Sequence, residues 1–137
     1  MSLPDITGVL EARLGEWADE KGISVAWDNI QFDPPSGATY LVSHDIPATP
    51  YSIDLAGKAV VHPGIYQVNI VAPSGSGKSD VKSIATQVAE LFPENSEIPG
   101  EGFSVWITAP PAIFPGITDA VSYTVPVSIN YRVHVSK

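Results

Sequence analysis

The hydrophobic positions at the start of the chain follow the spacing of an amphipathic helix. Pro4 and Asp5 suit the first turn of such a helix, and Gly22 can close it in the left-handed conformation. We therefore expect a helix that ends near residue 22. Its apolar face would consist of Ile6, Val9, Leu10, Leu14 and Trp17.

Further along, apolar and polar residues alternate, as they do in half-buried strands. The runs ISVAW (residues 23–27) and TYLVSH (39–44) are separated by the turn-forming DPPSG, so we expect them to pair as a hairpin. The runs GIYQVNIV (64–71) and FSVWIT (103–108) are rich in β-branched and aromatic residues. This composition predicts two more strands.

Helical spacing returns in residues 80–92, where Ser79 or Asp80 would cap the helix and Pro93 follows its end. The final run, residues 120–135, alternates over its whole length and predicts a long strand. Pro126 within it implies an edge position or a bulge, because proline cannot donate to the ladder. The three tryptophans stand on apolar faces and are expected in the core: Trp17, Trp27 and Trp106.

The order of these elements predicts the fold class. Two helices and mostly hairpin-like strand neighbours indicate an α+β protein, with a mixed, largely antiparallel sheet and both helices packed on one face. A length of 137 residues suits one domain that spans residues 1–137 and buries its own core.

Two proline-rich segments stand out as candidate partner-binding loops. Residues 46–63 are expected to form a long loop with one short strand near 59–61, and residues 109–116 cannot form a central strand. The first loop could contact a partner or fold back over its own core. Exposed apolar side chains on rigid scaffolds carry recognition, and the candidates here are Tyr51, Ile53, Leu55, Ile113 and Phe114.

The stretch APSGSGKS, residues 72–79, has the spacing of a nucleotide-binding P-loop, with alanine in place of the first glycine. A P-loop protein also needs successive βα units and an apolar strand that ends in Asp. Only 59 residues follow Lys78, and they are expected to hold one helix and two strands. We therefore interpret the stretch as a glycine-rich connection, and a small nucleotide-binding protein remains the minor alternative.

Composition excludes several functions. Fifteen acidic residues against seven basic ones give a net charge of −8, which argues against a general nucleic-acid binder. The absence of cysteine excludes disulfides, thiolate metal sites and cysteine nucleophiles. No apolar run is long enough to span a membrane, and no leader is evident, so we expect a soluble protein made in a cytoplasm. We find no catalytic residues, metal ligands or cofactor-binding residues, and we expect that the chain is not an enzyme.

Three blocks of sequence resemble the tail terminator proteins of long-tailed bacteriophages and prophages, also called tail completion or minor tail protein U-like proteins. The first block is the N-terminal helix running into GISVAWDNIQFDPPSGATYLV. The second is GIYQVNIVAPSGSGKSDVKSIATQVAELF, and the third is the closing YTVPVSINYRV. Together they span nearly the whole chain.

This resemblance implies a structural virion protein without catalysis or cofactor. It would assemble with itself into a ring, expected to be hexameric, at the head-proximal end of the tail. The ring would cap the tail tube protein, stop tube growth and meet the head–tail connector protein, while DNA passes through without specific binding. Another head–tail joining or tail-associated virion protein is the alternative.

Overall fold

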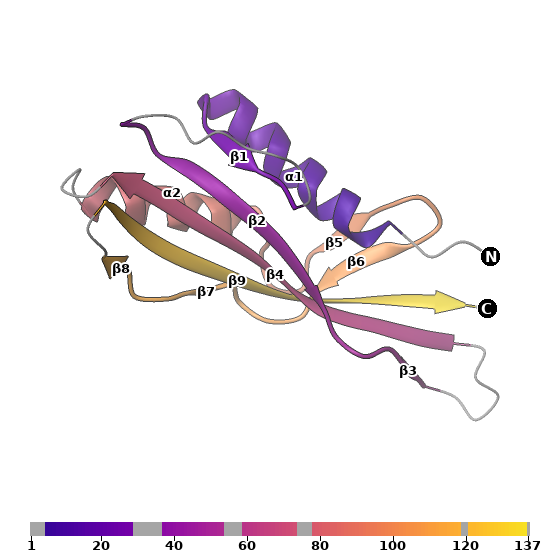
Figure 1. The fold of residues 1–137 in the computed structure, drawn as a ribbon. Coiled ribbons are helices and arrows are strands. Elements are labelled where there is room, and N and C mark those ends of the chain that lie inside the picture. Colours follow the sequence, from indigo (N-terminus) through magenta and orange to yellow (C-terminus); the bar gives the residue numbers. More distant parts are fainter. Residues whose placement is uncertain (1–4, 29–36, 54–58, 74–77, 119–120, 137) are drawn as a thin grey trace.

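The computed structural model describes residues 5–28, 37–53, 59–73, 78–118 and 121–136 (Figure 1). Two helices and nine strands lie in these ranges. In chain order they are α1 (Ile6–Lys21), β1 (Ser24–Ala26), β2 (Tyr40–Pro47), β3 (Tyr51–Ser52), β4 (Ala59–Pro73), α2 (Lys78–Glu90), β5 (Glu97–Pro99), β6 (Ser104–Ile107), β7 (Ala112–Ile113), β8 (Ile117–Thr118) and β9 (Ser122–Ser136).

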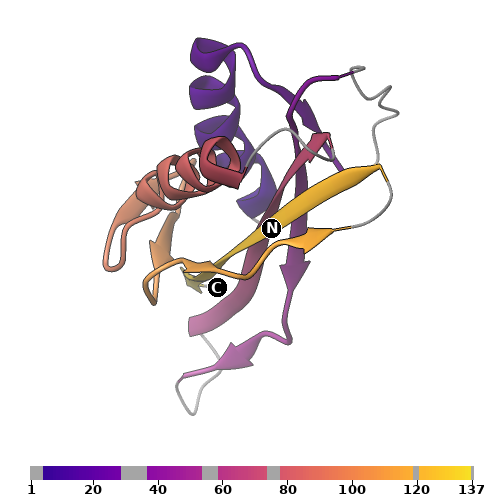
Figure 2. The same ribbon diagram turned by 90° about the vertical axis from the view of Figure 1, so that its left-hand side faces the viewer.

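One sheet contains all the strands, in the order β1-β2-β4-β9-β6-β5, with β3 added to β4 and with β7 and β8 added to β9. Every pairing is antiparallel except that of β1 with β2. Both helices lie on the same side of this sheet (Figure 2). The expected α+β class, with a mixed sheet and two helices on one face, is therefore confirmed.

The expected hairpin between the first two strands is wrong, because β1 and β2 run parallel, with Ser24 opposite Tyr40. The direction of β2 is set by its antiparallel pairing with β4, which extends over eight residues. The three residues of β1 pair with the side of β2 that faces away from β4, so that β1 is the edge strand of the sheet. Side-chain alternation identifies the buried face of a strand and carries no information on its direction.

The centre of the sheet is the pair formed by β4 and β9, which match over 15 residues each. The expected short strand at residues 59–61 is the beginning of β4, which continues through Pro63. The Pro63 carbonyl accepts a hydrogen bond of 2.9 Å from the Ala48 amide. The nitrogen and carbonyl of a strand residue point to the same side, so the missing N–H faces β2 and spares the ladder with β9.

The edge position expected from Pro126 is also wrong, because β9 has neighbours on both sides. The Pro126 carbonyl accepts a hydrogen bond of 2.9 Å from the amide of Phe114. The missing N–H therefore faces the short strands β7 and β8, and the ladder with β4 is preserved. A proline can stand in a strand with two neighbours when one neighbour is this short.

The core lies between the helices and one face of the sheet. It is built from the inward side chains of α1, α2 and the strands, including Leu10, Leu14, Ala18, Leu41, Tyr66, Val68, Ile70, Val81, Ala85, Val88, Phe92, Val105, Ile107, Val125, Val127, Ile129 and Val133. Trp17 and Trp27 pack against it half-buried, as the apolar pattern predicts. Trp106 is an exception: it is 38% exposed and points outward between buried Val105 and Ile107.

The ends of α1 follow from its sequence. The Asp5 side chain accepts a hydrogen bond of 3.0 Å from the Gly8 amide, and Gly22 adopts φ of 69° at the other end. Helix α2 begins at Lys78, two residues before the expected start, so Ser79 and Asp80 lie in its first turn. The Arg13 guanidinium donates to the Leu91 carbonyl and joins α1 to the end of α2.

Candidate functional site

Most of the described residues in the segment expected to be the long loop 46–63 lie in strands. The end of β2, β3 and the start of β4 are joined by hydrogen bonds from Ala48 to Pro63 (2.9 Å) and from Ile53 to Ala59 (3.1 Å). Together with the end of β9 they form a projection away from both helices (Figures 1 and 2). We call this projection the arm and define it as residues 46–53, 59–65 and 131–136. The loop expectation failed because the pairing with β4 satisfies the backbone of this segment.

The arm exposes two of the predicted contact residues. Tyr51 is 52% exposed and Ile53 is 53% exposed, whereas Val61, opposite Tyr51 in the ladder, is buried. Leu55 lies outside the described residues. The arm therefore exposes the apolar side chains of Tyr51 and Ile53 and buries that of Val61.

Cross-strand pairing brings further exposed side chains onto one face of the arm. Ile46 pairs with Ile65, Tyr51 stands in line with His134 across β4, and Trp106 of β6 pairs with Arg132. The face carries no helix, because both helices cover the opposite side of the sheet. We call it the arm face, and it consists of Ile46, Tyr51, Ile65, Trp106, Arg132 and His134.

The other two predicted contact residues lie far from the arm along β9. Ile113 in β7 is 44% exposed and Phe114 is 48% exposed, and Ile117 and Val121 beside them are exposed as well. The short strands β7 and β8 pair with the first half of β9. Residues 109–116 are thus kept out of the sheet centre, as their three prolines predict. The structure does not bring the two predicted loops together.

A hydrogen-bond network holds the base of the arm to α1. The two oxygens of Asp45 accept from the Thr7 hydroxyl (2.5 Å) and the Tyr131 hydroxyl (2.6 Å). Asp28 contacts the His44 ring at 2.8 Å and accepts from the Asp45 amide at 3.1 Å. His44 and Asp45 are therefore both held by hydrogen bonds to other elements.

This network borders a cleft of about 590 Å³ between the start of α1 and the arm. Its lining mixes Asp5, Thr7 and Asp45 with proline and alanine side chains of the arm. The pKa of Glu11, on the same helix, is raised by burial and by the nearby carboxylates of Asp28, Asp5 and Asp45. Acidic groups are thus concentrated where α1 meets the arm.

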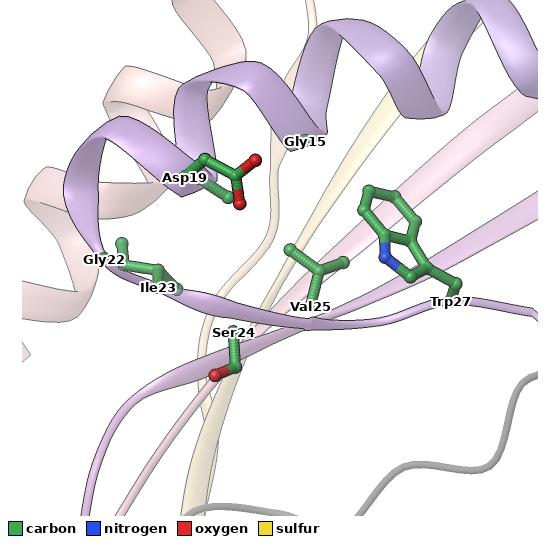
Figure 3. A pocket seen from close by; sticks show the side chains of 8 residues that line it. Gly15, Asp19, Gly22, Ile23, Ser24, Val25 and Trp27 are labelled. Atoms are coloured by element: carbon green, nitrogen blue, oxygen red, sulfur yellow. The ribbon is translucent and has the colours of Figure 1, made fainter.

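A second cleft, of about 460 Å³, lies between the end of α1 and β1 (Figure 3). Trp27 lies beside Gly15, so closely that a methyl group at Gly15 would touch its ring at 3.4 Å. Asp19 stands at the other end of the cleft, and Val25 points into it from β1. We call it the α1–β1 cleft, lined by Gly15, Ala18, Asp19, Gly22, Ile23, Ser24, Val25 and Trp27. The hydrophobic pattern does not predict this cleft, and its one sequence signal is the glycine in the middle of α1.

The P-loop interpretation is not supported by the sheet. Its preceding strand, β4, is antiparallel to both of its neighbours, β2 and β9, whereas a P-loop strand stands in a parallel sheet. Residues 74–77 of the stretch lie outside the described residues. In the part of the chain that the structure describes, no group of three or more His, Asp or Glu side chains could hold a metal ion.

Comparison with known proteins decides the family. The model of the family described as "Phage tail terminator protein" matches residues 5–131, which is nearly the entire fold from the α1 cap to β9. The chain belongs to the phage tail terminator family. One solved structure is 33% identical in sequence, covers 96% of this chain and 95% of its own, and superposes with a TM-score of 0.82. No curated protein matches the chain.

As a phage tail terminator family member, the protein is a structural component of the phage tail, and its family is not known for enzymatic activity. Such a component acts through contacts with other tail or head proteins. The exposed apolar segments at the arm and at β7–β8 are accordingly its candidate functional surfaces. Neither of the described helices is long and apolar enough to cross a membrane.

Proposed function

We propose that this protein caps the tail tube as a hexameric ring, stops growth of the tube and presents the surface that joins the head. The observation that carries this proposal is the match to the tail terminator family over residues 5–131. The ring would stand at the head-proximal end of the tail in the virion, after synthesis in the cytoplasm of the bacterial host. It would need neither a cofactor nor catalysis.

The two exposed apolar segments, at the arm and at β7–β8, support the proposal that the protein binds several partners. A ring subunit meets two neighbours, the tail tube protein on one side and the head–tail connector protein on the other. Apolar side chains left in water on short, rigid strands are suited to such contacts. The proposed contact residues are Tyr51, Ile53, Leu55, Ile113 and Phe114.

The charge of the chain suits a ring through which DNA moves. A net charge of −8 repels the phosphate backbone and gives no electrostatic affinity for it. We therefore propose that DNA passes the ring without specific binding.

The proposal is tested by electron microscopy of tubes assembled from the cognate tube protein and incubated with this chain. A single ring on one end of each tube, with six copies counted by native mass spectrometry, is the expected result. Binding along the tube wall, or binding only to isolated connector rings, would refute capping. The second of these outcomes would favour the alternative of a head–tail joining protein.

A further inference from the structure

We propose that the arm face of one copy docks on the α1–β1 cleft of the next copy, and that this contact is the repeating interface of the ring. The inference rests on the proposed ring and adds to it which two surfaces meet. Four observations support it: the residue types on the arm face, the charge of the cleft, the placement of the two surfaces, and the character of the remaining apolar segment.

The arm face has the composition of a protein contact. Tyr51, Trp106 and Arg132 belong to the three residue types that contribute most to interface energies. Ile46 and Ile65 are exposed beside one another in the ladder and add apolar area. An exposed surface with these side chains is stabilised when a partner removes it from water.

The described residues of the arm include one arginine, Arg132, and no Asp or Glu, in a chain whose net charge is −8. Glu97 of β5 pairs with Trp106 at the border of the arm face. A surface with an exposed arginine beside aromatic side chains fits an acidic partner with apolar groups to contact.

The α1–β1 cleft offers that combination. Its floor contains the half-buried Ile23, Val25 and Trp27, and Asp19 stands at its rim. Glu16 and Glu20 are exposed on the same end of α1 and add negative charge near Asp19. Because Gly15 has no side chain, the ring of Trp27 packs closely against the backbone of α1 at that position. The cleft is therefore complementary to the arm face in charge and in polarity.

The two surfaces lie at opposite ends of the subunit. In both views the arm lies at the bottom and the end of α1 with β1 lies at the top (Figures 1 and 2). A head-to-tail contact that closes into a ring needs two different, complementary patches on each copy. Opposite ends satisfy this requirement, and they prevent a chain from docking on itself.

The apolar segment at β7–β8 is a weaker candidate for the acidic cleft. Residues 109–118 contain no charged side chain, so they offer nothing to Asp19 and its neighbours. Exposed Ile113 and Phe114 are consequently left free for the tube or the connector. On this assignment the arm joins copies of the chain, and β7–β8 joins the ring to another protein.

Crosslinking tests whether the arm face of one copy lies close to the α1–β1 cleft of the next. Because the chain contains no cysteine, only the introduced thiols can react. The test variant carries His134→Cys on the arm face and Ser24→Cys at the cleft, both at exposed positions. A matched control carries His134→Cys with Thr118→Cys, which places the second thiol in β8. Each variant is treated with a short bis-maleimide, as free protein and on tail tubes, and is separated on a denaturing gel.

We expect a ladder of multimers with Ser24→Cys that stops at the size of the ring, and dimers at most with Thr118→Cys. A ladder with Thr118→Cys instead would overturn the inference and place the arm at β7–β8. Rings seen on tubes without a ladder in the Ser24→Cys variant would also overturn it, and would leave the proposed function intact. Conversely, a ladder in free protein that does not cap tubes would support this interface and refute capping.

The chemistry of the contact is tested by exchanging charges. Arg132→Glu and Asp19→Lys should each weaken self-association about tenfold or more, because each places like charges in contact. The double variant should recover to within about threefold of the original protein, since the pair is restored in reverse. Circular dichroism shows that each variant is folded. Two folded single variants that associate normally would contradict the proposed contact.

Discussion

The Tyr131 hydroxyl donates a hydrogen bond of 2.6 Å to an oxygen of Asp45 and thereby ties β9 to β2 where the arm begins. Thr7 of α1 donates to the other oxygen, so one carboxylate connects three elements. Burial raises the pKa of Tyr131, and its hydrogen bond to Asp45 raises that pKa further. The phenol therefore remains protonated, and remains a donor, throughout the range in which the protein would be handled.

Replacing Tyr131 with phenylalanine should loosen the base of the arm. The change leaves an oxygen of partly buried Asp45 without its donor, which costs about 1–2 kcal/mol. Urea unfolding should show a lower midpoint for Tyr131→Phe at pH 7. The control Tyr51→Phe removes a hydroxyl from a half-exposed ring and should leave the midpoint unchanged. Equal midpoints for Tyr131→Phe and the original protein would show that the bond contributes nothing to stability.

Gly15 within α1 and Gly22 directly after its end should respond in opposite ways to the same substitution. Gly22 has φ of 69°, which alanine adopts only with strain, so Gly22→Ala should destabilise the fold by about 1 kcal/mol. Gly15 lies inside the helix, and an added methyl group would meet Trp27 at 3.4 Å, an ordinary contact. Gly15→Ala should therefore stabilise by about 0.5–1 kcal/mol. Thermal unfolding of both variants measures the difference, and a destabilised Gly15→Ala would show that the α1–β1 cleft cannot accept a methyl group.

Glu11 should make the protein less stable as the pH rises from acid toward neutral. Burial and neighbouring carboxylates raise its pKa in the folded state above the ordinary value of 4.5, so the folded state binds the proton more tightly than the unfolded state. The contribution of Glu11 is therefore most favourable below pH 4.5 and is lost as the pH rises through the raised pKa. Glu11→Gln should melt higher than the original protein at pH 7 and no higher at pH 4. The same scan with Glu16→Gln, at an exposed position of the same helix, is the control.

The apolar side chains at β7–β8 should matter for assembly and not for folding. Ile113→Ser with Phe114→Ser removes two exposed groups, for which stability changes within about 0.5 kcal/mol are usual. We expect an unchanged melting temperature and weakened binding to tube ends or to the connector, measured by co-sedimentation. Thr118→Ala, exposed in neighbouring β8, should bind normally. A folded double variant that binds both partners as well as the original protein would exclude this segment as a contact.

The helices and the core were predictable because both depend on local patterns. Helical spacing identifies the buried face of α1, and Asp5 and Gly22 mark its ends with groups that have one physical role each. Alternation likewise identifies the inward residues of the long strand β9. These signals lie within a few residues of one another, so tertiary contacts are not needed to interpret them.

The arm and the α1–β1 cleft depend on partners that are distant in sequence. Prolines at 47, 50 and 63 suggest a loop. Only the pairing of β4 with β2 and β9 shows that the missing N–H group of a proline in a strand leaves the main ladder hydrogen bonds intact. Trp106 is a large apolar residue of the type usually found in a core. It faces outward because its neighbours Val105 and Ile107 occupy the inward positions of β6. The face on which a residue stands follows from strand register, and register is a property of the whole sheet.

Tube capping is tested by the length distribution of tail tubes assembled with and without this chain. The chain is added while the cognate tube protein is still polymerising, and tube lengths are measured by electron microscopy. If the protein is a terminator, long tubes should disappear as its concentration rises, and the tubes that remain should stop growing when more tube protein is supplied. Tubes that continue to lengthen at a saturating concentration of folded protein would show that the chain does not cap the tube.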